Sequence, residues 1–229
     1  MATFTLPDME VSAWALFNNM RQSPTLRSFR VAIVGEVAYA HYGAGGRALE
    51  QKLDILVDRT PQTIPGVPGS LVKVLKRLLA EEFPGLFMAE DDTWEYDLRM
   101  MVNATTMLPV KFVQPGLAGY LEHTSLTPVA NIANNNLPYI RADDLLVQNV
   151  FRLSLLPLEE QRRQAAENVA MLRQRARAVQ RRYDPHRPLR LTPAQREAVL
   201  NGLDRVFFTY SPVSPNEWRL LFGLFQIAE

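Results

Sequence analysis

The chain contains no cysteine, and this absence removes several kinds of chemistry at once. Without a thiol there can be no disulfides, no thiolate metal ligands and no cysteine nucleophile. Histidine is scarce as well, because His41, His123 and His186 are the whole set and lie far apart in the sequence. A zinc site built mainly from histidine is therefore not expected.

Long apolar segments are also missing. No run of about 20 apolar residues could span a bilayer, and the N-terminus MATFTLPDMEVSAW lacks a basic stretch followed by an apolar run. The formal net charge is only +1, so no strong overall field draws the chain to nucleic acid or anionic lipid. We expect a soluble, cytoplasmic protein with no membrane partner.

What the chain does contain is a hydrophobic fraction of 47% over 229 residues, enough for a sizeable core. In its first half, helical periodicity alternates with short β-branched runs. The first predicted helix, over 8–22, carries apolar side chains at Val11, Trp14, Ala15, Phe17 and Met20. Further helices are predicted over 36–42 and 70–79, and strands over 30–34, 53–57, 86–90, 94–103 and 108–113. This order predicts a mixed α/β fold.

After about residue 125 the pattern becomes helical. One apolar-periodic segment runs to Leu156, and residues 158–183 repeat apolar side chains at three- and four-residue steps. Capping boxes at Thr192 and Ser214 predict two later helices, since each pairs a hydroxyl with Gln or Glu three residues on. We therefore divide the chain into an α/β domain over 1–125 and a helical C-terminal region over 126–229.

Two neighbouring segments carry a resemblance to a known superfamily. They are AIVGEVAYAHYG, from Ala32 to Gly43, and KLDILVD, from Lys52 to Asp58. Together they resemble the nucleotidyltransferase signature, in which a strand ends in Gly-Gly or Gly-Ser and the next strand carries two metal-binding carboxylates. A third family carboxylate lies on a later strand, which residues 108–113 resemble.

The resemblance covers about residues 25–160, and LPYIRADDLLV from Leu137 is similar to the segment after the catalytic domain in many small members. It implies a nucleotidyltransferase-like mixed sheet flanked by helices, with a helical C-terminal extension. In that family the carboxylates hold Mg²⁺ ions, which bridge the nucleotide phosphates and neutralise charge as the phosphoryl bond breaks.

At the family's carboxylate positions this sequence departs from the pattern. Lys52 stands at the first position, Asp54 at the second and Lys111 at the third. Glu36 follows Gly35, where the family has a small side chain. Exchanging two carboxylates for two ammonium groups changes the formal charge by about four units, which a Mg²⁺ site does not tolerate. We therefore expect no metal, no cofactor and no standard nucleotidyl transfer.

The leading hypothesis is a protein that binds a small anionic or polar molecule in the former nucleotide cleft. As an enzyme of secondary metabolism it would also transform that molecule. The candidate catalytic residues are Lys52, Asp54 and Lys111: the lysines attract the anion, and Asp54 or Glu36 exchanges a proton. A desolvated lysine could also act as a base or form a Schiff base. The same charges could instead form a salt-bridged remnant without a ligand. The candidate ligand-binding residues are Gly35, Glu36, His41 and Tyr42.

Two other functions stay open at this point. One is a catalytically inactive binding or regulatory module, for which the arginines between 162 and 190 would form an RNA face or an apolar surface would meet a protein. The near-neutral net charge favours an ordinary solvated helix face over an RNA face. The other is an active nucleotidyltransferase with displaced acids, for instance Glu50 or Asp58.

Overall fold

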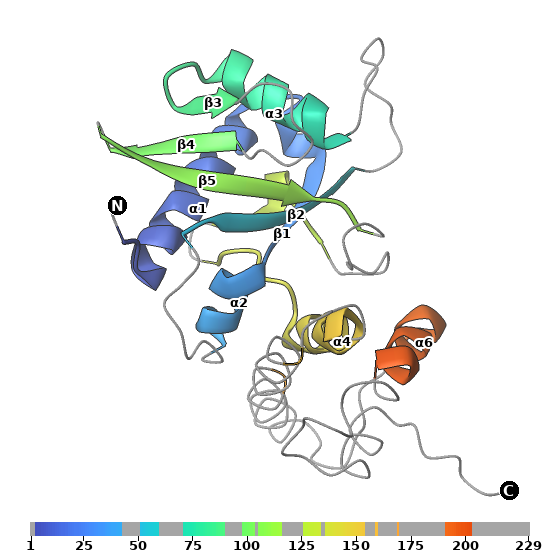
Figure 1. Cartoon of the computed structure of the whole chain (residues 1–229). Helices are drawn as coiled ribbons and strands as arrows, with labels where there is room; N and C mark the ends of the chain where they lie inside the picture. Colours follow the sequence, from blue (N-terminus) through green and yellow to red (C-terminus); the bar gives the residue numbers. More distant parts are fainter. Residues whose placement is uncertain are drawn as a thin grey trace, which may run out of the picture. The chain divides into compact units, whose positions relative to one another are not determined.

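The computed structural model describes residues 3–42, 51–59, 71–89, 98–103, 105–115, 126–133, 136–153, 159, 169 and 191–202 (Figure 1). These residues fall into two compact units. The first is built around the sheet and contains the described residues up to Ile140 except Tyr42. The second contains Tyr42 and the described residues from Arg141 on, which include the helices α4 (Ala142–Leu153) and α6 (Pro193–Gly202). The boundary predicted near residue 125 stays a prediction.

The first helix, α1, spans Leu6–Gln22 and begins where the sequence supplies its own cap. Thr5 and Asp8 form a capping box, in which the Thr5 backbone N–H donates to Asp8 Oδ2 at 2.8 Å. These hydrogen bonds satisfy backbone donors that the first helical turn leaves without partners. The predicted helix is therefore confirmed, and it starts two residues before the predicted position.

The apolar face predicted for α1 is partly wrong. Val11 is 66% exposed and Ala15 is exposed as well, whereas Phe17 and Met20 are buried as their spacing suggested. The buried stripe consists of Met9, Ser12, Ala13, Leu16, Phe17 and Met20. This stripe has the same helical period as the predicted one but lies on a different side of the helix. The side that packs on the sheet is buried, and the sequence period alone does not identify that side.

Six strands form one mixed sheet in the order β3-β4-β5-β2-β1-β6. Every neighbouring pair is antiparallel except β2 and β5, which run parallel at the centre. The mixed α/β prediction is confirmed. The strands are β1 (Phe29–Val34), β2 (Leu53–Arg59), β3 (Phe87–Ala89), β4 (Leu98–Asn103), β5 (Thr106–Val113) and β6 (Thr127–Pro128).

Alternate residues of the strands point to opposite faces of the sheet, and one face forms the core. Helices α1 and α3 (Leu71–Glu82) pack on this core face, as Figure 1 shows. The core-face strand residues include Phe29, Val31, Ile33, Leu53, Ile55, Val57, Leu108, Val110 and Phe112. The residues between them, Asp54 and Lys111 among them, form what we call the second face.

The segment over 126–140 covers the outer edge of β1, and its part before Leu137 was not predicted from the sequence. It contains β6 and the short 3₁₀ helix η2 (Val129–Asn131), and another 3₁₀ turn, η1 (Leu26–Ser28), leads into β1. Ile33 donates its N–H to the Pro138 carbonyl at 2.7 Å, and the Ile140 N–H donates to the Ile33 carbonyl at 3.0 Å. These bonds satisfy edge groups of β1 that would otherwise remain without backbone partners.

In the second unit, α4 (Ala142–Leu153) and α6 (Pro193–Gly202) are in contact. The capping box predicted at Thr192 is confirmed, because the Thr192 N–H donates to Gln195 Oε1 and the Gln195 N–H donates to Thr192 Oγ1. Gln195 also donates from Nε2 to Asp144 Oδ1 at 2.9 Å. The Ser214 box and most of the predicted helix over 158–183 lie outside the described residues.

Within the described ranges, no helix is both long enough and apolar enough to cross a membrane.

The capping box makes the stability of the fold depend on pH through Asp8. Hydrogen bonds from Thr5 lower the pKa of Asp8 below its usual value of 3.8, so the carboxylate stabilises the folded state above that pH. This stabilisation disappears as the pH falls through the lowered pKa. We expect Asp8→Asn to unfold at lower urea concentration than wild type at pH 6, with the difference shrinking below about pH 4. A Glu82→Gln control, which removes an exposed carboxylate of α3, should show no such convergence.

Candidate functional site

Asp54 lies near the centre of the sheet, on the second face. Its backbone partners are Val34 on the antiparallel strand β1 and Lys111 on the parallel strand β5. Residues in such register point to the same face and stand about 5 Å apart across neighbouring strands. Asp54 is only 8% exposed, so its carboxylate is almost removed from water. A carboxylate this deeply buried needs a cation or several hydrogen bonds to remain charged.

Lys52 provides a cation at this position. Its Nζ lies 3.8 Å from Asp54 Oδ2, and its side chain is 32% exposed, against 11% for that of Asp54. Lys52 immediately precedes β2 and is two residues from Asp54, so both side chains lie on the same side of the chain. The strand alternation predicted this shared side, and the ion pair shows that the two charges meet.

Gly35 closes the other side of the same carboxylate oxygen. It begins α2 (Gly35–His41) with a φ of +66°, a conformation that residues with a side chain rarely adopt. A Cβ atom on Gly35 would lie 3.1 Å from Asp54 Cβ and 3.2 Å from Asp54 Cγ, and closer still to Asp54 Oδ2. The space beside the glycine is thus adjacent to the Asp54 carboxylate.

Lys111 completes a group that we call the Asp54 centre: Gly35, Lys52, Asp54 and Lys111. Lys111 is half-buried beside Asp54 in the sheet register. Among the residues that the structure describes, Lys111 makes no ion pair or hydrogen bond through its side chain. The structure therefore brings the three predicted catalytic residues together and gives them two ammonium groups for one carboxylate.

The predicted ligand-binding residues on and after α2 are placed differently from one another. Glu36 is half-buried in the first turn, next to Gly35. His41 ends the helix, about 9 Å from Gly35 along the axis at a rise of 1.5 Å per residue. Tyr42 is a half-buried residue of the following turn and belongs to the second unit. Glu36 is therefore next to the Asp54 centre in the sequence, whereas His41 is at the opposite end of α2.

His41 belongs to a second cluster, with Glu10 and Tyr139. The His41 and Tyr139 rings stack with their centroids 3.7 Å apart and their planes 13° from parallel. The Tyr139 hydroxyl donates to Glu10 Oε1 at 2.6 Å, and His41 Nδ1 lies 3.6 Å from the same oxygen. The cluster ties α1, α2 and the segment before α4 together. Sequence reasoning missed Glu10 and Tyr139 because no local motif joins residues so far apart.

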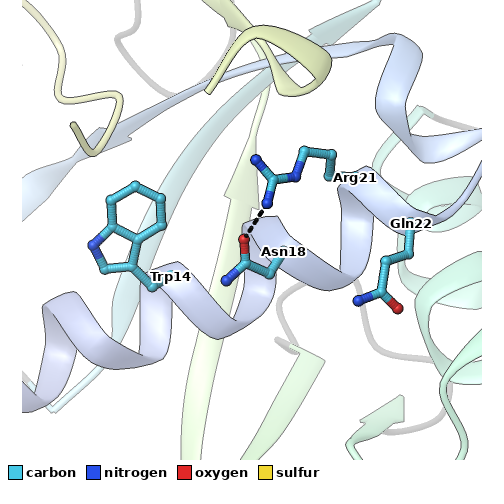
Figure 2. A pocket seen from close by; sticks show the side chains of 4 residues that line it. All are labelled: Trp14, Asn18, Arg21 and Gln22. Carbon is cyan, nitrogen blue, oxygen red and sulfur yellow. Dashed lines mark hydrogen bonds between the residues drawn. The ribbon is translucent and has the colours of Figure 1, made fainter. Parts of the chain in front are cut away.

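A hollow of about 450 Å³ runs along the outside of α1, and the sequence did not predict it. It is lined by Trp14, Asn18, Arg21 and Gln22 (Figure 2). Arg21 donates from Nη2 to Asn18 Oδ1 at 3.1 Å and from Nη1 to the carbonyl of Ile132 at 3.3 Å. These bonds hold α1 against the segment that follows β6. The Arg21 guanidinium at this hollow therefore stabilises the packing of α1.

Of the displaced acids considered from the sequence, only Asp58 is described. Asp58 is on the second face with Asp54, and its Oδ2 lies 3.9 Å from Nη1 of Arg30, its partner in the β1–β2 register. Glu50 lies outside the described residues. In the described part of the chain, no group of three or more Asp, Glu or His side chains could hold a metal ion.

The order of elements and the central β2–β5 pair define a nucleotidyltransferase-like α/β fold, as the sequence predicted. A solved structure with this fold is an antigenic nucleotidyltransferase-like protein from Paracoccidioides brasiliensis. It matches with a TM-score of 0.55 and 10% sequence identity, over 85% of this chain and 88% of that one. No family model matches the chain, and no curated protein matches it in sequence. The likeness therefore establishes the fold.

The close approach of Gly35 to Asp54 predicts an unusually costly glycine substitution. Gly35→Ala forces a side chain onto a positive φ, at a cost of about 1–3 kcal/mol, and also displaces the Asp54 carboxylate. We expect its free energy of unfolding, measured by urea titration, to fall by more than the backbone strain alone explains.

Gly85→Ala is the matched control. Gly85 has a φ of +86°, but a Cβ atom there would meet nothing within 4 Å, so only the backbone strain applies. The double variant Gly35→Ala/Asp54→Ala should cost less than the sum of its single variants, because the clash disappears with the carboxylate. Equal losses at the two glycines would contradict the close packing against Asp54.

The Glu10–His41–Tyr139 cluster predicts a smaller effect. Tyr139→Phe removes one hydroxyl donor from a partly buried bond and should lower the free energy of unfolding by about 0.5–1.5 kcal/mol. In a double-mutant cycle with Glu10→Ala, the two losses should not add, since both remove the same bond. Additive losses would show that the 2.6 Å contact contributes nothing to stability.

Proposed function

We propose that the Asp54 centre binds a small anionic or polar molecule without the help of a metal ion. The observation that carries this proposal is the placement of Lys111 beside an Asp54 carboxylate that already has Lys52 at 3.8 Å. One ammonium group thus balances the carboxylate, and the second is left to attract an anion. Asp54, and Glu36 in the turn that follows Gly35, are the acidic groups that would exchange a proton with a ligand held there.

The charges of the centre argue against Mg²⁺. This ion takes six oxygen ligands in an octahedron, usually from one or two carboxylates, phosphates and water. Asp54 is the one carboxylate of the centre, and its neighbours in the sheet are the apolar Val34 and the cationic Lys111. The ammonium group of Lys52, 3.8 Å from the carboxylate, and that of Lys111 on the neighbouring strand both repel a divalent cation. The set of donors therefore does not fit the metal that the fold family employs.

The two other functions have less support. An active nucleotidyltransferase would use displaced acids such as Glu50 or Asp58. Asp58 pairs with Arg30 and stands four residues along β2, about 13 Å from Asp54, and Glu50 lies outside the described residues. The arginines that an RNA interface would use, between residues 162 and 190, lie outside the described residues. The fold neighbour is described only as nucleotidyltransferase-like, which adds no ligand to this argument.

Removing the charge of Lys111 tests the proposal. Inorganic phosphate, ATP, GTP and CTP would each be titrated calorimetrically with and without Mg²⁺. We expect at least one of these anions to bind without Mg²⁺, Lys111→Met to weaken that binding by about ten- to a hundred-fold, and Lys111→Arg to retain most of it.

Lys73→Met is the matched control, because Lys73 is an exposed lysine of α3 and its loss changes the net charge equally. Binding that appears only with Mg²⁺, or that Lys111→Met and Lys73→Met weaken equally, would contradict a metal-independent anion site at Lys111.

A further inference from the structure

We infer that the ammonium group of Lys52 is the resident cation of Asp54 and that it keeps divalent cations out of the Asp54 centre. This inference rests on the proposed function, since it gives a physical cause for the absence of a metal requirement. It concerns Lys52, however, whereas anion binding depends on Lys111, so the two can fail separately.

The first step is the position of the carboxylate. Asp54 is on a central strand, 8% exposed, with fully buried Val34 on one side in the register. Burial of a charge in such surroundings is unfavourable unless an opposite charge or hydrogen bonds compensate it. The buried Asp54 carboxylate on the second face therefore requires a positive charge beside it.

The second step is the environment of one oxygen. Asp54 Oδ2 is the atom that a Cβ on Gly35 would meet most closely, and it is also the atom that Lys52 Nζ approaches at 3.8 Å. It is thus enclosed by backbone on one side and by the ammonium group on another. A divalent ion that coordinated this oxygen would have to share the space with Nζ, and the two like charges would repel each other strongly.

The third step is the tether. Lys52 is only two residues from Asp54, so the chain holds its ammonium group near the carboxylate at a high effective concentration. A dissolved cation must compete with this tethered charge. Changing the residue at position 52 should therefore change which cations the centre accepts.

The register indicates how a metal site could be created. Lys52→Asp would place a carboxylate about 7 Å along the chain from Asp54 on the same side, and Lys111→Asp would place another about 5 Å away on β5. Three carboxylates converging from two strands are a donor set suited to Mg²⁺ or Mn²⁺. The same positions that now exclude a divalent ion would then bind one.

The experiment uses Mn²⁺ alone as the probe, and measures the loss of the free-ion signal by electron paramagnetic resonance. In wild type, Asp54→Asn should leave the amount of bound Mn²⁺ unchanged. In Lys52→Asp/Lys111→Asp we expect one additional bound ion per chain, and that ion should be lost when Asp54→Asn is added. Lys73→Asp/Lys76→Asp on α3 makes the same change in net charge and should gain no ion that depends on Asp54.

Two results would overturn the inference: Mn²⁺ bound by wild type and lost in Asp54→Asn, or a folded Lys52→Asp/Lys111→Asp variant that gains no ion. If that variant does not fold, Lys52→Gln replaces it. Its Tm should rise by a few degrees with Mn²⁺ while that of wild type does not, and an equal response overturns the inference. Failure of phosphate or nucleotide binding with these metal results intact would refute only the proposed function.

Discussion

The structure around the candidate site depends on one constraint, a carboxylate that is buried on the central strand of the sheet. Asp54 has to be compensated where it stands, and Lys52 supplies the charge from two residues away. It also needs room, which Gly35 provides by lacking a side chain and by adopting a φ of +66°. The turn from β1 into α2 therefore adopts its positive φ at the residue that lies against the carboxylate. A glycine at this position suits the backbone conformation and also leaves room for the Asp54 side chain.

The two faces of the sheet explain how a fold can persist at 10% identity to its neighbour. The core face is filled by apolar side chains from the strands, α1 and α3, and any residues of suitable volume and pattern can build it. The second face carries the charged residues and has no comparable packing requirement at Lys52 or Lys111, which are both half-buried. Charges there can change sign while the core stays apolar, which is why a fold alone does not define a reaction.

The parts of the fold that were predictable are those that local sequence determines. β1 and β2 were found from short β-branched runs, and the capping box at Thr192 was found because its partners are three residues apart. Val11 was assigned to the wrong face, because an apolar residue shows that a helix is amphipathic but not which phase the sheet covers. The Tyr139–Glu10 bond could not be predicted, since it depends on how a distant segment folds back along β1. The proximity of Lys52 and Asp54 followed from strand alternation, whereas Lys111 was added by the family resemblance and placed by the β2–β5 register.

The pairing of β2 with β5 affects how fast the chain folds. On one side of this pair the sheet consists of β1 and β2 with β6 at its edge, and on the other of the sequence-local meander β3, β4 and β5. Asp54 and Lys111 stand on opposite sides of the boundary between these two halves. Joining the halves closes the long loop between Leu53 and Val110, which is entropically costly and slow compared with forming either half. A chain with both halves formed but unjoined would hold Gly35, Lys52 and Asp54 together, while Lys111 would still be apart from them.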